Sequence, residues 1–220
     1  MRIFPLGENA LIVEFGTEVS LELNRKSLNL AAYFQKNPFP GLVEAVPAYA
    51  STSVFYDPII VRNTLEGFGS AFEAVKDLCE KADSNFEVAR GEKQIVEIPI
   101  NIDSSALDLD VLCEFSGLSP SEVTSIFLER IYTVFMIGFL PGFAYMGEVD
   151  ERIAAPRRET PRKRVPKGSV GIAEKQTGIY PLETPGGWQI IGRTETQVFD
   201  PLNEHPCLLE AGHEVKFVRV

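Results

Sequence analysis

The chain has 220 residues and a mass of 24.4 kDa, a length that suits one large domain or two small ones. Hydrophobic residues make up 45% and charged residues 24%, which is typical of globular proteins and excludes a disordered chain. The net charge of −10 argues against a protein whose whole surface binds nucleic acid or an anionic membrane. The three cysteines lie far apart, which excludes a CxxC site and a disulfide framework and fits a reducing cytosol.

The longest charge-free segment is 131–147. It is shorter than the roughly 20 residues that span a bilayer, and Gly138, Pro141 and Gly142 interrupt it. No apolar stretch of signal-peptide length follows Met1. We therefore predict a cytoplasmic protein without a membrane segment, and we expect the uncharged segment to border a partner protein.

The first ninety residues alternate between strand and helix patterns. Two apolar runs around the turn signal Gly7-Glu8-Asn9 predict a hairpin, and a helical repeat from Leu21 ends at Asn37-Pro38. A second helix is predicted to begin near Thr64. The expected strands are 2–5, 10–15, 42–47 and 53–56. This order predicts an open α/β sandwich with both helices on one face, as an N-terminal domain of residues 1–90 with its boundary in 83–93.

Residues 91–220 change in character. Ser119, Pro120 and Glu122 form the capping-box signature of a helix that runs to about residue 130. Before and after it we expect a strand at 94–100, a helix at 107–115 and strands at 131–139 and 214–220. Nine of the 17 glycines fall between Gly138 and Gly192, and short strands with Gly and Pro turns predict a β-barrel or sandwich. The chain as a whole is therefore predicted to be α+β.

Generic catalytic templates do not fit the sequence. It contains no GxSxG elbow, Walker loop or GxGxxG motif. Its two histidines, His205 and His213, are not placed with second ligands at metal-binding spacing, so we predict no metal site. Cys207 lies in an apolar run, 207–209, that we interpret as a strand with a small core residue rather than a nucleophile.

Two glycine-rich loops combine aromatic residues with tight turns. The first, 138–145, either packs its aromatics in the core or forms a rigid pocket wall, because glycine lets a ligand approach the backbone. The other, 178–192, contains the only tryptophan and a Pro185-Gly186-Gly187 turn that could offer backbone N–H groups to a ligand oxygen. For both loops the residues leave the choice between core and pocket open. The pocket candidates are Gly142, Phe143, Tyr145, Tyr180, Gly186, Gly187 and Trp188.

A basic loop lies between them. Six basic residues fall within the eleven positions from Arg157 to Lys167, and prolines stiffen the segment. A rigid loop bearing arginines suits binding of a carboxylate or phosphate by paired hydrogen bonds. We therefore take Arg157, Arg162 and Lys167 as candidate anion-binding residues. The alternative is a structural role, in which Arg162 pairs with a buried carboxylate and braces the barrel.

Taken together, these loops resemble one family. The motifs GFxPGFxY, PRxxTPRxxVPxGSVGI, QTGxYPxxTPGGWxxIGRT and FDP stand here at 138–145, 156–172, 176–194 and 199–201. The N-terminal segments 6–10, 46–49 and 56–58 also fit, so the resemblance covers nearly the whole chain. The family is that of the 5-oxoprolinase B subunit, also known as allophanate hydrolase subunit 1 or the Kip-type inhibitor of a sporulation histidine kinase.

The resemblance implies a C-terminal cyclophilin-like β-barrel and a role in an ATP-dependent 5-oxoprolinase, which opens 5-oxo-L-proline to L-glutamate. It implies A-type and C-type partner subunits and ATP with Mg²⁺ used by the complex, none of it bound covalently. Coupling to ATP suggests that the lactam carbonyl oxygen is phosphorylated, and positive charge such as that of the basic loop would stabilise that step. Other relatives imply two alternatives, a protein that inhibits a histidine kinase and a subunit of an allophanate hydrolase or urea carboxylase.

The sequence departs from the family pattern at three positions. Leu128 stands where a histidine is common, Glu174 where a glycine is common, and His213 where an aspartate is usual. No base and no pair of Mg²⁺-binding carboxylates is evident in the chain. The catalytic residues therefore stay unassigned, and we expect part of the active site to belong to a partner subunit.

Overall fold

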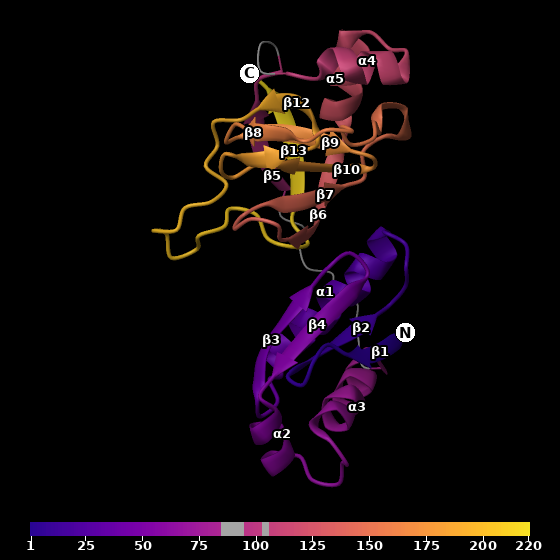
Figure 1. The fold of residues 1–220 in the computed structure, drawn as a ribbon, viewed down its shortest axis with the longest axis vertical. Coiled ribbons are helices and arrows are strands. Elements are labelled where there is room, and N and C mark those ends of the chain that lie inside the picture. Colours follow the sequence, from indigo (N-terminus) through magenta and orange to yellow (C-terminus); the bar gives the residue numbers. More distant parts are fainter. Residues whose placement is uncertain (85–94, 103–105) are drawn as a thin grey trace. The chain divides into compact units, whose positions relative to one another are not determined.

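The computed structural model describes residues 1–84, 95–102 and 106–220. The chain divides into two compact units, Met1–Glu92 and Lys93–Val220 (Figure 1). The domain boundary expected at 83–93 lies mostly outside the described residues, as does Gln94 at the start of an expected strand. Within the described ranges, no helix combines the length and the apolar character needed to cross a membrane.

The first unit is a four-stranded antiparallel sheet with helices on one face. Its strands are ordered β1 (Arg2–Pro5), β2 (Ala10–Glu14), β4 (Ser51–Tyr56) and β3 (Leu42–Pro47). In β4 every second residue is buried, as expected when one face is covered. Helix α1 (Leu21–Lys36), capped by Ser20, packs on β3 and β4, and α3 (Ala71–Ser84) packs beside β2 and α1. The predicted hairpin, strands and one-sided helices are confirmed.

The second helical region differs from the expectation of one helix from Thr64. The structure has two helices there, α2 (Pro58–Thr64) and α3. Helix α2 begins because the Asp57 carboxylate accepts hydrogen bonds from the backbone N–H groups of Ile59 and Ile60, and Pro58 suits the first helical position. Gly67, with φ of 90°, lies between the two helices in a conformation that glycine adopts readily.

The second unit contains a seven-stranded sheet that is nearly closed into a barrel (Figure 1). Its strand order is β12-β9-β10-β7-β6-β13-β5. The two edge strands are linked where Asn101, just after β5, forms a bridge with Arg193 of β12. A separate pair, β8 (Arg162–Val165) and β11 (Thr184–Gly186), lies beside this sheet. The seven strands are β5 (Ile95–Ile100), β6 (Ile131–Ile137), β7 (Ala144–Gly147), β9 (Ser169–Ala173), β10 (Gln176–Ile179), β12 (Gln189–Arg193) and β13 (Glu214–Arg219).

Two helices and a short 3₁₀ turn complete this unit. They are α4 (Leu109–Ser116), α5 (Pro120–Glu129) and η1 (Glu151–Ile153). The capping box predicted for α5 is present, since Ser119 Oγ accepts from the Glu122 backbone N–H and the Glu122 carboxylate accepts from the Ser119 backbone N–H. Val123 and Phe127 of α5 are buried in the same core as the sheet.

The charge-free segment 131–147 is partly buried in the unit itself: Tyr132, Val134 and Phe135 are buried, whereas Ile131, Phe139 and Pro141 are exposed. That this segment borders a partner protein stays a prediction.

The interpretation of 207–209 as a strand was wrong. Cys207 forms only an isolated bridge with Phe199, in a long connection between β12 and β13, and its side chain is half-buried.

Candidate functional site

The three loops singled out in the sequence meet around one aromatic cluster. Phe143 lies at its centre, with ring centroids 4.8 Å from Tyr145, 5.3 Å from Tyr180 and 5.4 Å from Trp188. All three contacts are edge-to-face, the arrangement that the aromatic quadrupole favours. Val165, from the basic loop, packs in the same cluster. Phe143, Tyr180 and Trp188 are buried in this cluster, as a core role requires, and Tyr145 is half-buried. A role of the cluster as a pocket wall stays a prediction.

Close packing explains two of the candidate glycines. A Cβ added to Gly186 would lie 2.5 Å from the Tyr180 hydroxyl oxygen. A Cβ added to Gly142, whose φ is 78°, would lie 2.6 Å from the Cβ of Phe199. Both positions therefore need glycine so that the backbone can approach a neighbouring aromatic side chain.

Arg157 is the cation that lies directly on this cluster. Its guanidinium carbon is 5.9 Å from the centre of the Trp188 ring, within the range of a cation–π interaction. The side chain is exposed, and among the described residues no ion pair holds it. The backbone on both sides is fixed, because the Arg158 N–H donates to the Gly187 carbonyl at 2.8 Å and the Gln189 side chain donates to the Pro156 carbonyl at 3.0 Å.

The two tyrosines of the cluster are held in the neutral form. Burial raises the pKa of Tyr145, and the nearby Arg157 charge lowers it by a smaller amount. Burial raises the pKa of Tyr180 to about 12, against the smaller opposing effects of a hydrogen bond from the Trp188 backbone and of Arg157. At neutral pH both hydroxyls therefore remain protonated beside an arginine.

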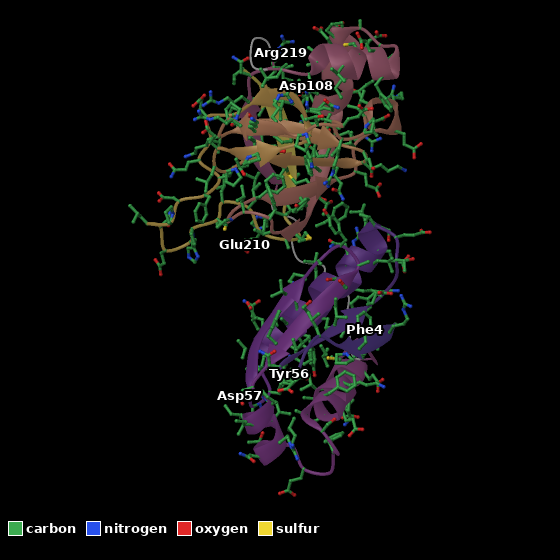
Figure 2. All side chains as sticks on the ribbon, viewed as in Figure 1. Phe4, Tyr56, Asp57, Asp108, Glu210 and Arg219 are labelled. Atoms are coloured by element: carbon green, nitrogen blue, oxygen red, sulfur yellow. The ribbon has the colours of Figure 1, made fainter. Side chains whose placement is uncertain are left out.

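Arg162 is not available to an anion in the way that the sequence suggested. Its two terminal nitrogens donate to the two carboxylate oxygens of Asp108, at 2.8 and 2.6 Å. Arg158 donates to the same carboxylate at 2.9 Å. Asp108 is labelled in Figure 2, in the second unit. Its side chain is only 2% exposed. The structure thus places Arg162 in the bracing arrangement that was the alternative reading of the basic loop.

The remaining candidates lie apart from the cluster or at its rim. The Lys167 side chain is exposed, and no contact within the described part of the chain joins it to the aromatic rings. Its carbonyl accepts a hydrogen bond from Arg193 at 3.0 Å. Gly187 is half-buried beside Pro161, with room for a Cβ at 3.6 Å from the nearest atom.

Asp108 is a residue of the site that the sequence patterns did not reveal. It lies in the first turn of the helix expected at 107–115, where an aspartate is ordinary, and its partners lie 50, 54 and 82 positions further along the chain. Both histidines lie elsewhere: His205 is exposed, and His213 Nδ1 accepts from the Glu210 N–H at 3.2 Å. Among residues 1–84, 95–102 and 106–220, no three His, Cys, Asp or Glu side chains gather as metal ligands would.

Comparison with known proteins places this fold and site in a family. Residues 1–209 match the family described as carboxyltransferase domain, subdomain C and D. The 5-oxoprolinase B subunit of Bacillus subtilis (strain 168) is 44% identical, over 100% of this chain and 92% of that protein. The 5-oxoprolinase B subunit of Escherichia coli O157:H7 is 37% identical, over 99% of this chain and 95% of its own length.

Solved structures agree with this assignment. The crystal structure of TTHA0988 superposes on the whole chain with a TM-score of 0.82 at 34% identity. This chain spans 40% of the length of that protein. The resemblance that the motifs indicated is therefore confirmed, and the chain belongs to the carboxyltransferase subdomain C and D family, together with the 5-oxoprolinase B subunits.

Proposed function

We propose that this chain is a subunit of an ATP-dependent 5-oxoprolinase complex, in which it binds 5-oxo-L-proline for ring opening to L-glutamate. Two full-length relatives, at 44% and 37% identity, are named as B subunits of 5-oxoprolinase. The observation in the structure that carries the proposal is the exposed Arg157 guanidinium, 5.9 Å from the centre of the Trp188 ring. In a small cyclic acid, the carboxylate could bind to this guanidinium group and the ring could pack on the aromatic cluster.

The chemistry of the site matches such a ligand. The guanidinium group of Arg157 forms paired hydrogen bonds with a carboxylate. The half-buried ring of Tyr145 provides apolar surface for the lactam ring, and the buried Trp188 ring packs against it at a centroid distance of 5.8 Å. The backbone N–H groups of Gly186 and Gly187 lie in the same loop as Trp188 and are candidate donors to the amide oxygen.

Among the described residues, no acidic cluster marks a Mg²⁺–ATP site. Within the described ranges, acidic side chains do not gather in threes, and the buried Asp108 is already engaged by two arginines. We therefore assign nucleotide binding to the partners and no phosphoryl-transfer step to residues of this chain. The same reasoning leaves the catalytic base with a partner.

We further propose that the partners are an A-type and a C-type subunit and that Lys93–Val220 is a cyclophilin-like β-barrel domain. TTHA0988 supports the proposal of partner subunits, because this chain matches only 40% of that protein. The remaining length of TTHA0988 is further polypeptide joined to the matching part in one chain. The nearly closed seven-stranded sheet, bridged between Asn101 and Arg193, supports the second.

Reconstitution tests the proposal. The purified chain alone is expected to show negligible 5-oxoproline-dependent ADP release, and co-expression with A-type and C-type subunits is expected to produce it. Arg157→Ala should raise the KM of the complex for 5-oxoproline about tenfold to a hundredfold, the effect of losing a charge-assisted hydrogen bond. Turnover by the isolated chain would contradict the need for partners.

A matched variant and a second substrate sharpen the result. Lys163→Ala removes an exposed positive charge from the same basic loop without touching the aromatic cluster, so it should leave the KM unchanged. Urea offered in place of 5-oxoproline should give no turnover. If Lys163→Ala and Arg157→Ala have equal effects, the loop acts through its overall charge, and the specific role of Arg157 is wrong.

A further inference from the structure

The Asp108 carboxylate accepts four hydrogen bonds although its side chain is only 2% exposed. Its Oδ1 accepts hydrogen bonds from Arg158 at 2.9 Å and Arg162 at 2.6 Å. Its Oδ2 accepts from Arg162 at 2.8 Å and from the Ile190 backbone N–H at 2.6 Å. The Asp108 backbone N–H in turn donates to the Ile190 carbonyl at 2.9 Å. One residue thus ties two arginines of the basic loop to strand β12.

This arrangement is not the ordinary use of an aspartate at a helix start. Asp108 is the N-cap of α4, where an aspartate side chain usually accepts from the backbone N–H of the second or third helical residue. Here the side chain makes no such bond. The Asp108 carboxylate instead accepts hydrogen bonds from the arginines of the basic loop and from β12. The start of α4 therefore lacks a side-chain cap.

The contacts of Asp108 reach a residue next to Arg157 and a residue near Trp188. Arg158, the next residue, is held by the carboxylate and by its own hydrogen bond to Gly187. Ile190, held through its backbone, is two residues from Trp188 in the same strand region. The guanidinium of Arg157 and the ring beneath it therefore both sit on backbone that Asp108 fixes. In addition, the carboxylate holds Arg158 and Arg162, whereas the Arg157 side chain over Trp188 is exposed.

We propose that Asp108 is a positioning residue of the candidate site, which holds the Arg157 guanidinium over Trp188 by fixing Arg158 and the start of β12. Asp108 touches no substrate in this proposal and acts only through Arg157. Its effect on catalysis rests on the proposed 5-oxoprolinase function, whereas its effect on the geometry of Arg157 and Trp188 does not.

Trp188 provides a direct readout, because it is the only tryptophan in the chain. The emission maximum and lifetime of its fluorescence respond to a cation placed over the indole ring. We compare the full-length chain with Asp108→Asn, Arg157→Ala and the double variant, without any ligand. Asp108→Asn is expected to change the emission as Arg157→Ala does, and the double variant is expected to show no further change. Asp110→Asn is the matched control, since Asp110 is an exposed acid in the first turn of the same helix.

The assembled complex tests the functional part. Each single variant should raise the KM for 5-oxoproline by about tenfold or more, and the double variant should match Arg157→Ala alone. Multiplied effects in the double variant, or unchanged Trp188 emission in Asp108→Asn together with a lower Tm, would overturn the proposal. A wild-type complex without 5-oxoproline turnover would instead refute the proposed function, and the fluorescence comparison would still decide the role of Asp108.

A milder variant covers the case in which Asp108→Asn does not fold. Arg158→Lys keeps the charge and the backbone hydrogen bond to Gly187 but loses the guanidinium contact with Asp108. It should change Trp188 emission in the same direction as Arg157→Ala and by a smaller amount. Unchanged emission in this variant, with a reduced Tm, would mean that the Asp108 cluster stabilises the unit without positioning Arg157.

Discussion

Arg162 and Asp108, 54 residues apart in the sequence, form a two-pronged ion pair in which the two terminal guanidinium nitrogens and both carboxylate oxygens take part. The side chains are 22% and 2% exposed, so the pair is largely removed from water. The stability of such a pair depends strongly on its geometry, because a buried carboxylate without a positively charged partner destabilises the fold. The basic loop is therefore held to the unit at this point rather than presented freely to solvent.

Arg162→Lys is expected to lower the free energy of unfolding by about 1.5–3 kcal/mol, since lysine keeps the charge and loses the planar fork. Chemical denaturation measures the effect. Arg164→Lys is the matched control, because the neighbouring Arg164 pairs with Glu183 at a position where both side chains are well exposed, and there the change should stay within about 0.5 kcal/mol. Equal effects of the two substitutions would contradict the bracing role of Arg162.

Gly186→Ala and Gly187→Ala should differ although the residues are adjacent. A Cβ on Gly186 meets the Tyr180 hydroxyl at 2.5 Å, so the buried ring must shift, at a cost of about 1–3 kcal/mol in unfolding free energy. A Cβ on Gly187 has its nearest neighbour at 3.6 Å, so the change should be within about 0.5 kcal/mol. Thermal unfolding with Trp188 fluorescence as the probe distinguishes the two, and similar values would refute the tight packing at Gly186.

Glu174→Gly is expected to stabilise the protein by about 1 kcal/mol. Glu174 lies in the β9–β10 turn with φ of 54°, a left-handed conformation that costs a residue with a Cβ roughly 1–2 kcal/mol and glycine almost nothing. The glycine expected here from the family pattern thus has a conformational reason. Lys175→Gly, in the same turn, should destabilise instead, since it removes the ion pair with Glu151. A lower Tm for Glu174→Gly would count against strain at this turn.

Stability is expected to fall at alkaline pH partly through Tyr180. Its pKa in the folded protein is about 12, above the ordinary value of 10.0, because burial disfavours the charged phenolate. The unfolded chain therefore releases this proton first, and the stabilising contribution, complete below pH 10, is lost as the pH rises towards 12. Urea denaturation between about pH 8 and 12 should show a shallower decline for Tyr180→Phe than for the wild type. Identical slopes would mean that Tyr180 does not titrate in this range.

The sequence predicted best those features that depend on neighbouring residues. The α5 capping box involves only Ser119 and Glu122, and the structure contains it as expected. The motif loops were also identified, because glycine, proline and aromatic residues are distinctive in short stretches. Their meeting around Phe143 is consistent with the family match, whereas composition alone left core and pocket equally open.

What the sequence did not predict depends on distant contacts. That Arg162 could pair with a buried carboxylate was one of the two interpretations of the basic loop, but its partner Asp108 could not be identified, since an aspartate at a helix start is already explained by capping. Helix α2 was missed because seven residues give too short a periodic signal, while Asp57 and Pro58 do carry a recognisable start. Cys207 was assigned to a strand on its apolar neighbours, although Leu208 is exposed and the segment has no regular pairing partner among the described residues.

The position of β13 has a consequence for synthesis of the chain. This strand, Glu214–Arg219, lies between β5 and β6, pairing with the first in parallel and with the second in antiparallel orientation. The sheet of the second unit therefore cannot be completed during translation until residues 214–219 have been made, whereas the strands of the first unit all lie within residues 2–56. A ribosome that stalls before residue 214 leaves the inner edges of β5 and β6 unpaired, and such edges associate with other chains.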